Sequence, residues 1–105
     1  MAVKKYNKLV RDKIPEIIEK VGKTCTISIL SETDYIKMLD AKLDEELAEY
    51  HRNGSLEELA DLMEVIYSVA KAKGCSENEL EKIRNEKASK RGSFDKMIFL
   101  IEVSE

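Results

Sequence analysis

Residues 44–61 read DEELAEYHRNGSLEELAD, and this stretch decides how the chain folds. Seven of its eighteen side chains are carboxylates, and they lie on both sides of the pair Asn53 and Gly54. Asn-Gly favours a tight bend, because both residues tolerate the left-handed backbone conformation. The stretch therefore predicts two helices joined by a short turn, which makes them antiparallel neighbours.

The starts of three helices are marked by one repeated spacing, a serine followed three residues later by an acid. In such a capping box the serine oxygen accepts a hydrogen bond from an N–H of the first helical turn. The pairs are Ser31 with Asp34, Ser55 with Glu58, and Ser76 with Glu79. A shorter helix precedes them, with Pro15 suited to its first turn and Gly22 suited to the position after its end.

Two short segments have the pattern of strands. Residues 25–30, CTISIL, alternate apolar and polar side chains, and residues 97–103, MIFLIEV, form an apolar run. The two could pair with each other. The chain is therefore predicted to be one domain, residues 1–105, and mainly α: a helical bundle with a small two-stranded β element.

Composition argues against several classes of protein. Charged residues make up 37% of the chain, against about 25% in an average protein. Residues 32–64 hold eleven acids and three bases, so we expect no binding to nucleic acid, whose phosphates carry the same charge. No segment approaches the ~20 apolar residues of a membrane span, and the amino terminus lacks a signal peptide, which predicts a cytoplasmic protein with no membrane partner. Cys25 and Cys75 lack the spacing of a zinc site or disulfide framework, so we expect buried thiols.

Four carboxylates are predicted to converge on the two helices around the bend. At about 100° per residue, Glu46 falls at the edge of an apolar stripe, and Glu49 lies one turn further on. On the next helix Glu58 falls inside an apolar arc, with Asp61 at its border. Like charges about 5 Å apart repel by roughly 3 kcal/mol at an effective dielectric near 20, so we expect a cation between them. Carboxylates without paired His or Cys suit Mg²⁺ or Mn²⁺, and Mg²⁺ keeps open positions for a phosphorylated ligand.

Each of these residues also has a purely structural interpretation. Glu58 could serve only to cap its own helix. The ExxE pair, Glu46 and Glu49, could bond to Lys42 or Arg52 along one helix. The presence of ExxE before the bend and ExxD after it favours the metal site over these alternatives.

The strings EELAEY and EELADLMEVIYSVA resemble the MazG-like all-alpha nucleotide pyrophosphohydrolases. The opening YNKLVRDKIPEII and the closing EKIRNEKASKRGSFDKMIFLIEV resemble the branch called phosphoribosyl-ATP pyrophosphohydrolase-like, or house-cleaning, so the likeness covers nearly the whole chain. The resemblance implies an enzyme that uses Mg²⁺ to hydrolyse a nucleoside triphosphate to monophosphate and pyrophosphate, by attack of water on the α-phosphorus. Carried over by position, its metal ligands and catalytic residues are Glu46, Glu49, Glu58 and Asp61.

Basic residues on either side of this centre are candidates for phosphate binding. The family's downstream basic positions match Lys87 and Arg91, which could instead complement the dipole at a helix end. Lys8, Arg11 and Lys13 precede the first helix and are further candidates.

The helix predicted after Ser55 is apolar over more than half its circumference, which predicts a homodimer or higher homo-oligomer. The other expected partner is the nucleotide substrate. Two alternative functions remain open at this point: phosphoribosyl-ATP pyrophosphohydrolase of histidine biosynthesis, and a non-catalytic helical oligomer that binds a nucleotide or a metal.

Overall fold

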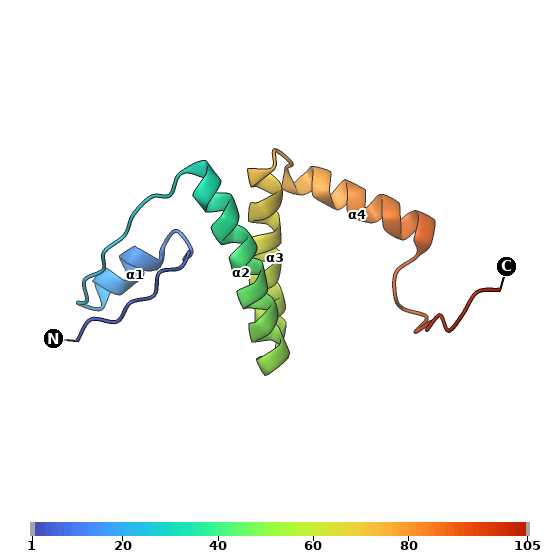
Figure 1. Cartoon of the computed structure of the whole chain (residues 1–105), viewed down its shortest axis with the longest axis horizontal. Coiled ribbons are helices and arrows are strands. Elements are labelled where there is room, and N and C mark those ends of the chain that lie inside the picture. The colour runs from blue at the N-terminus through green and yellow to red at the C-terminus, as the bar shows by residue number, and fades with distance from the viewer. Residues whose placement is uncertain (1, 105) are drawn as a thin grey trace.

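A computed structural model describes residues 2–104 and contains four α-helices in that range (Figure 1). They are α1 (Ile14–Lys20), α2 (Glu32–Asn53), α3 (Leu56–Ala72) and α4 (Glu77–Arg91). The mainly α prediction is confirmed. Helices α2 and α3 form an antiparallel hairpin, α1 lies to one side of it, and α4 projects from the end of α3 on the other side.

The helix starts follow the predicted caps. The hydroxyl oxygens of Ser31, Ser55 and Ser76 each accept an N–H bond from the residue three positions ahead, at 3.3, 3.3 and 3.2 Å. The bend between α2 and α3 is made by Gly54, whose φ of 65° lies in the left-handed region. Glycine adopts that conformation without the steric cost of a Cβ, so the hairpin turns within two residues.

The buried core lies between α2 and α3. Within residues 2–104 the buried hydrophobic side chains are Leu39, Val65 and Ala70, with exposed fractions of 5%, 9% and 8%. A second apolar face of α3, the helix predicted to be apolar over more than half its circumference, is left uncovered by the rest of the chain. We call it the α3 stripe, and it consists of Leu56, Leu59, Met63 and Ile66.

The prediction of a two-stranded β element is wrong for this structure, because residues 2–104 contain no strand. The two segments, 25–30 and 97–103, lie toward opposite ends of the molecule (Figure 1), so neither supplies the other with hydrogen-bond partners. A strand needs a neighbouring strand to satisfy its backbone N–H and C=O groups. The expected burial of Cys25 is wrong for the same reason: its segment is uncovered and its thiol is exposed.

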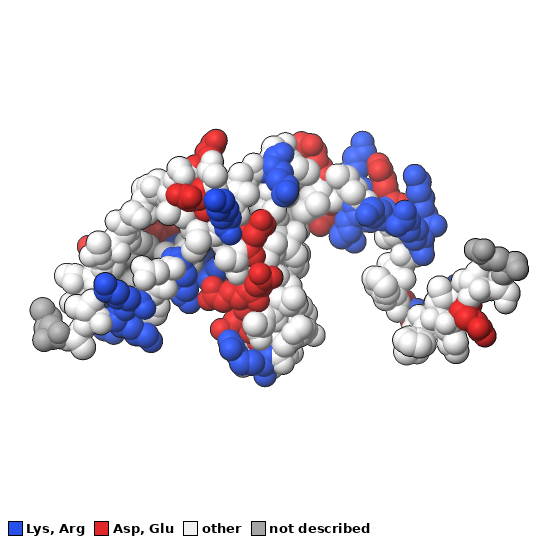
Figure 2. All heavy atoms as spheres, viewed as in Figure 1, with Lys and Arg blue, Asp and Glu red and all other residues white. Residues whose placement is uncertain are grey.

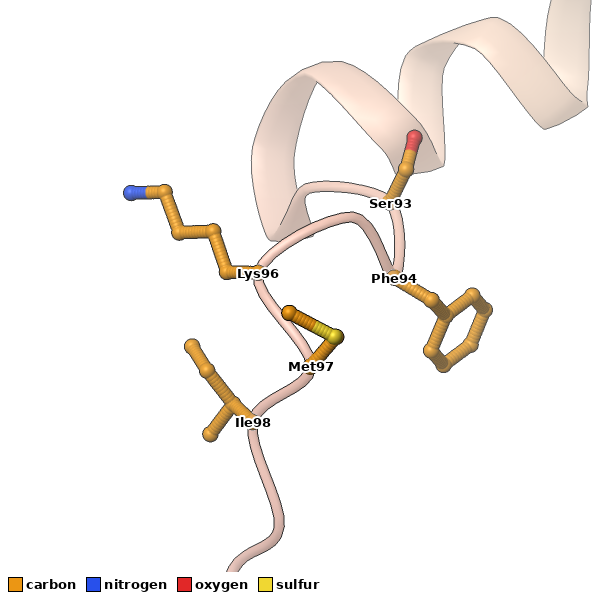
Figure 3. Close-up of a pocket in the computed structure, with 5 residues that line it drawn as sticks. All are labelled: Ser93, Phe94, Lys96, Met97 and Ile98. Atoms are coloured by element: carbon orange, nitrogen blue, oxygen red, sulfur yellow. The ribbon is translucent and has the colours of Figure 1, made fainter.

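The chain is elongated, with principal extents of 66 × 31 × 24 Å. After α4 the backbone turns around a hollow of about 260 Å³, lined by Ser93, Phe94, Lys96, Met97 and Ile98 (Figure 3). Phe94 and Met97 at this turn are 97% and 90% exposed, so the hollow is an uncovered loop rather than a built binding cavity. None of the helices in residues 2–104 combines the length and apolar character that a membrane crossing requires.

Candidate metal centre

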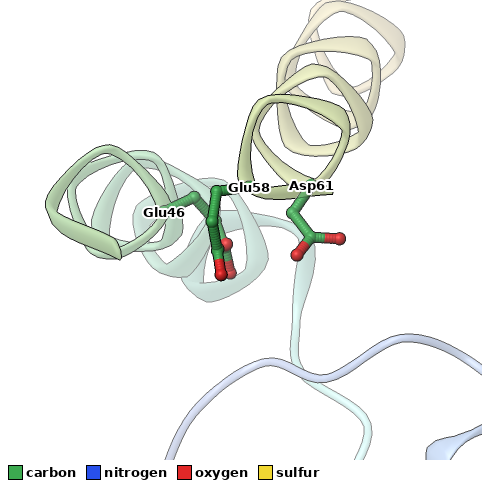
Figure 4. A group of neighbouring side chains, drawn as sticks. All are labelled: Glu46, Glu58 and Asp61. Atoms are coloured by element: carbon green, nitrogen blue, oxygen red, sulfur yellow. The ribbon is translucent and has the colours of Figure 1, made fainter. Parts of the chain in front are cut away.

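Three carboxylates meet across the α2–α3 hairpin. One oxygen each of Glu46, Glu58 and Asp61 lies within 4.8 Å of the other two, and the three side chains are half-buried. Figure 4 shows Glu46 reaching from α2 toward Glu58 and Asp61, which project from the first turns of α3. The short bend holds the two helices side by side, so residues twelve or more apart in the sequence share one site.

Each of the three carboxylates has one positive or hydrogen-donating partner from its own chain. Arg11 Nη2 lies 2.6 Å from Asp61 Oδ1, and Lys42 Nζ lies 3.5 Å from Glu46 Oε1. Asn53 Nδ2 donates to Glu58 Oε1 at 3.1 Å. These partners offset part of a repulsion that amounts to about 3 kcal/mol per pair of unit charges at this spacing and an effective dielectric near 20.

Glu49, the fourth predicted ligand, stands outside this group. Its carboxylate pairs with Arg52, one turn on along α2, and this contact raises the pKa of Arg52. The structural alternative considered for Glu49 is therefore present in this structure. The hairpin brings together three of the four predicted carboxylates and leaves Glu49 one helical turn away.

The Glu58 side chain does not complete the predicted capping box. Its backbone N–H donates to Ser55 Oγ, but its carboxylate accepts from Asn53 and lies beside Glu46. The helix start is thus capped by Ser55, while the Glu58 carboxylate is positioned in the acidic group. This geometry favours a ligand role for Glu58 over a role limited to capping.

The basic segment before α1 lies against this group of acids. Besides the Arg11 contact with Asp61, Lys8 Nζ donates to Glu45 Oε1 at 3.0 Å. That hydrogen bond is the main cause of a raised pKa for Lys8 and a lowered pKa for Glu45. Of the three predicted phosphate contacts in this segment, Arg11 therefore reaches the candidate centre itself, and Lys8 reaches Glu45, the neighbour of Glu46. Lys13, at the start of α1, forms no ion pair within residues 2–104.

The predicted phosphate contacts on α4 lie elsewhere in the molecule. Lys87 and Arg91 are on the last turns of α4, which leaves α3 at the end opposite the bend. Figure 2 shows the acids gathered over the hairpin and a separate group of basic side chains at the end of α4. In this arrangement one chain does not bring Lys87 or Arg91 to its own carboxylates.

The donor set of the centre fits a small, hard cation. It consists of carboxylate oxygens, with no histidine or cysteine among them, which suits Mg²⁺ or Mn²⁺ better than zinc. Adjacent ligands of an octahedral Mg²⁺ lie about 3 Å apart. Glu46, Glu58 and Asp61 would therefore need to move their oxygens closer together by rotation of their side chains.

Two residues at or beside the centre were missed by sequence reasoning. Glu45, to which the sequence assigned no role, receives Lys8 and Lys42 at 3.0 and 3.3 Å. Asn53, interpreted only as a bend residue, donates to Glu58. Lys8 and Glu45 are 37 positions apart in the sequence, and no local spacing indicates that residues so far apart will pair.

Comparisons with known proteins find one local likeness. No protein-family model matches the chain, and no solved structure matches it. A stretch of 41 residues, 39% of this chain, is 58% identical to a protein of Mycolicibacterium smegmatis described as uncharacterized. The match spans 42% of that relative's length, so it reports a shared segment and assigns no family or activity.

Proposed function

We propose that this protein is a Mg²⁺-dependent nucleotide pyrophosphohydrolase of the MazG-like class, which converts a nucleoside triphosphate to a monophosphate and pyrophosphate. The observation that carries the proposal is the meeting of Glu46, Glu58 and Asp61 across the bend, with oxygens within 4.8 Å of one another. These are three of the four residues that the family resemblance marks as ligands. Mn²⁺ is the alternative cation, because it accepts the same oxygen donors.

The chain's own residues divide the work in this proposal. Glu46, Glu58 and Asp61 hold the cation. Bound Mg²⁺ supplies charge neutralisation, orientation of the phosphate oxygens and a lower pKa for a bound water. Glu49 stands one turn outside the group and is the best placed carboxylate to accept a proton from that water. Arg11 and Lys8 lie on the same side of the hairpin and are suited to bind phosphate oxygens.

The partners and location follow from the same proposal. The nucleotide is the substrate, and a homo-oligomer covers the α3 stripe, since an exposed apolar row at helical spacing is typical of an interface. A nucleotide hydrolase of this class works in the cytoplasm, where triphosphates and Mg²⁺ are present.

The test is a substrate panel assayed with Mg²⁺ by mass spectrometry. The panel contains standard, deoxy and damaged nucleoside triphosphates together with phosphoribosyl-ATP, and the expected products are a monophosphate and pyrophosphate. Preference for phosphoribosyl-ATP would assign the enzyme to histidine biosynthesis. Release of single phosphates would contradict the proposal. Metal-dependent nucleotide binding without turnover would instead identify a non-catalytic binding protein.

A further inference from the structure

The amino-terminal region is joined to the hairpin through the acids of the hairpin. Helix α1 packs against none of the other helices. Among the described residues, the hydrogen bonds and ion pairs that join residues 2–30 to α2 or α3 are two: Arg11 with Asp61, and Lys8 with Glu45. In Figure 4 the amino-terminal segment, drawn in pale blue, passes beneath Asp61. This region is therefore fastened at the candidate metal centre and beside it.

Residues 4–13, which we call the basic strap, have little else to hold them in place. The strap contains five basic residues and one acid. It includes no helix or strand, and all of its side chains except that of Leu9 are exposed. A segment with few buried apolar contacts and no regular backbone hydrogen bonds opens locally at a low cost in free energy. The strap is thus held by charge rather than by packing.

Asp61 is the point at which the strap and a metal ion would meet. Arg11 is its one ion-pair partner within residues 2–104, and Asp61 is also one of the three carboxylates that meet across the bend. The guanidinium and a divalent cation would draw on the same carboxylate, and two positive groups that share a carboxylate repel each other. Arg11 and the cation therefore compete for Asp61.

The exposure of the strap contacts indicates which competitor prevails. The side chains of Arg11 and Asp61 are 58% and 43% exposed, and those of Lys8 and Glu45 are 41% and 32% exposed. Ion pairs this exposed are screened by water and contribute little to stability. A divalent cation has twice the charge of Arg11 and three carboxylates to bind it. Glu45 would keep Lys42 at 3.3 Å after Lys8 leaves, so release of the strap leaves neither acid without a positive partner.

We infer that the basic strap is a built-in counter-ion that closes the candidate metal centre, and that a divalent cation releases it by displacing Arg11 from Asp61. The strap lowers the affinity of the centre for the metal, and metal binding frees the amino-terminal region. The inference rests on the metal site of the proposed function. It does not depend on hydrolysis of a nucleotide.

Zero-length cross-linking measures release of the strap without any assay of activity. A carbodiimide joins a lysine amine to a carboxylate that it contacts, so Lys8 and Glu45 should give a cross-linked peptide that mass spectrometry quantifies. The yield is compared between metal-free and Mg²⁺-saturated chain at equal ionic strength, since salt alone weakens exposed ion pairs. We expect Mg²⁺ to lower this yield several-fold. Lys71 and Glu77, 3.3 Å apart at the start of α4, are the internal reference, and their cross-link should keep its yield.

Glu58→Gln shows whether the release comes from metal bound at the centre. This variant removes one proposed ligand and neither contact of the strap, so Mg²⁺ should no longer change the Lys8–Glu45 yield. An equal loss of the cross-link in Glu58→Gln would indicate general screening by Mg²⁺ and would overturn the inference. A wild-type yield that Mg²⁺ leaves unchanged would overturn it as well.

Calorimetric titration with Mn²⁺ measures the competition itself. Arg11→Gln removes the charge at Asp61 and should tighten Mn²⁺ binding at least about tenfold, because a divalent and a monovalent cation roughly 6 Å apart repel by that factor even at the dielectric of bulk water. Lys13→Gln is the matched control. It removes the same charge two residues away, from an exposed side chain that forms no ion pair within residues 2–104, and should change the affinity much less. Circular dichroism checks that both variants keep the helical fold.

The outcomes separate this inference from the proposed function. Equal Mn²⁺ affinity of the wild type and Arg11→Gln would overturn the inference and leave the proposed function in place. Metal binding that releases the strap, with no turnover of any nucleotide in the panel, would overturn the proposed function and support the inference. If neither the wild type nor Arg11→Gln binds Mn²⁺, both are overturned.

Discussion

The α2–α3 hairpin and the C-terminal arm, which consists of residues 77–103 and so of α4 and the apolar tail after it, differ in how far the chain completes them by itself. The hairpin contains the three buried hydrophobic side chains of the described residues and the carboxylates that meet across the bend. The arm contains a well-capped helix and an apolar tail, but its hydrophobic side chains remain in water. Two amphipathic helices joined by a two-residue bend cover each other, whereas the arm depends on surface that its own chain does not bring to it.

The largest expected effect tests whether the chemistry belongs to the hairpin. Glu58→Gln removes one anionic oxygen from the carboxylate group, so we expect Mg²⁺-dependent turnover to fall by at least about a hundredfold. Glu57→Gln is the matched control, because Glu57 is exposed and outside the group. Steady-state kinetics of both variants measure this effect. Full activity of Glu58→Gln would show that the Glu58 carboxylate takes no part in the reaction.

A pair of truncations compares the packing of the two regions directly. Leu39→Ala leaves a cavity at a side chain that is 5% exposed, and should lower the free energy of unfolding by about 2 to 5 kcal/mol. Phe99→Ala changes a side chain that is 87% exposed, and should cost the isolated chain less than about 0.5 kcal/mol. Urea titrations at dilutions that separate the copies measure both. Equal losses would show that the arm packs on its own hairpin.

Metal binding should stabilise the hairpin and leave the arm unaffected. Mg²⁺ at a hundredfold excess over its dissociation constant stabilises the state that binds it by about 2.7 kcal/mol. We therefore expect a higher melting temperature with Mg²⁺, reversed by EDTA and abolished in Asp61→Asn. If the melting curves do not change at saturating Mg²⁺, the three carboxylates are ordinary surface charges that do not bind the metal.

Two cap removals give a smaller contrast. Ser55 and Ser76 make the same bond at the starts of α3 and α4. Ser55→Ala should lower the stability of the hairpin by about 1 kcal/mol while turnover is retained. Ser76→Ala should fray α4 locally with little change in the main transition, because α4 packs on α3 alone. Circular dichroism and hydrogen exchange distinguish the two outcomes. An equal loss of global stability in both variants would show that the hairpin and α4 unfold as one unit.

The smallest effect concerns the junction between the two regions. Partial burial, and then the Glu81 carboxylate that accepts its hydrogen bond, raise the pKa of Tyr67. Because the pKa is higher in the folded state, this contribution to stability is full below the ordinary tyrosine value of about 10 and is lost as pH rises through the folded value. Ultraviolet titration should find one tyrosine that ionises after the others, and Tyr67→Phe should remove it. Four tyrosines that titrate together would indicate an open junction.

Most of the fold was predictable because helix signals are local. The spacing of Ser31, Ser55 and Ser76 to their acids placed three helix starts correctly, and Asn53-Gly54 placed the bend. The strands at 25–30 and 97–103 were predicted from alternating apolar residues and from an apolar run. Each pattern describes its own segment and does not indicate which other segment will pair with it. Pairing requires two segments to meet, and in this structure they lie toward opposite ends of the molecule.

At the candidate centre, sequence and tertiary structure contributed different parts. The ExxE and ExxD spacings by themselves determined which carboxylates share a helix face, because 3.6 residues per turn relates positions three apart. Only the packing of α2 on α3 decided that Glu46 meets Glu58 and Asp61 while Glu49 turns to Arg52. Only the path of the chain before α1 brought Arg11 to Asp61, fifty positions away. Such contacts depend on which distant segments the fold brings together, and no local spacing along the sequence indicates this.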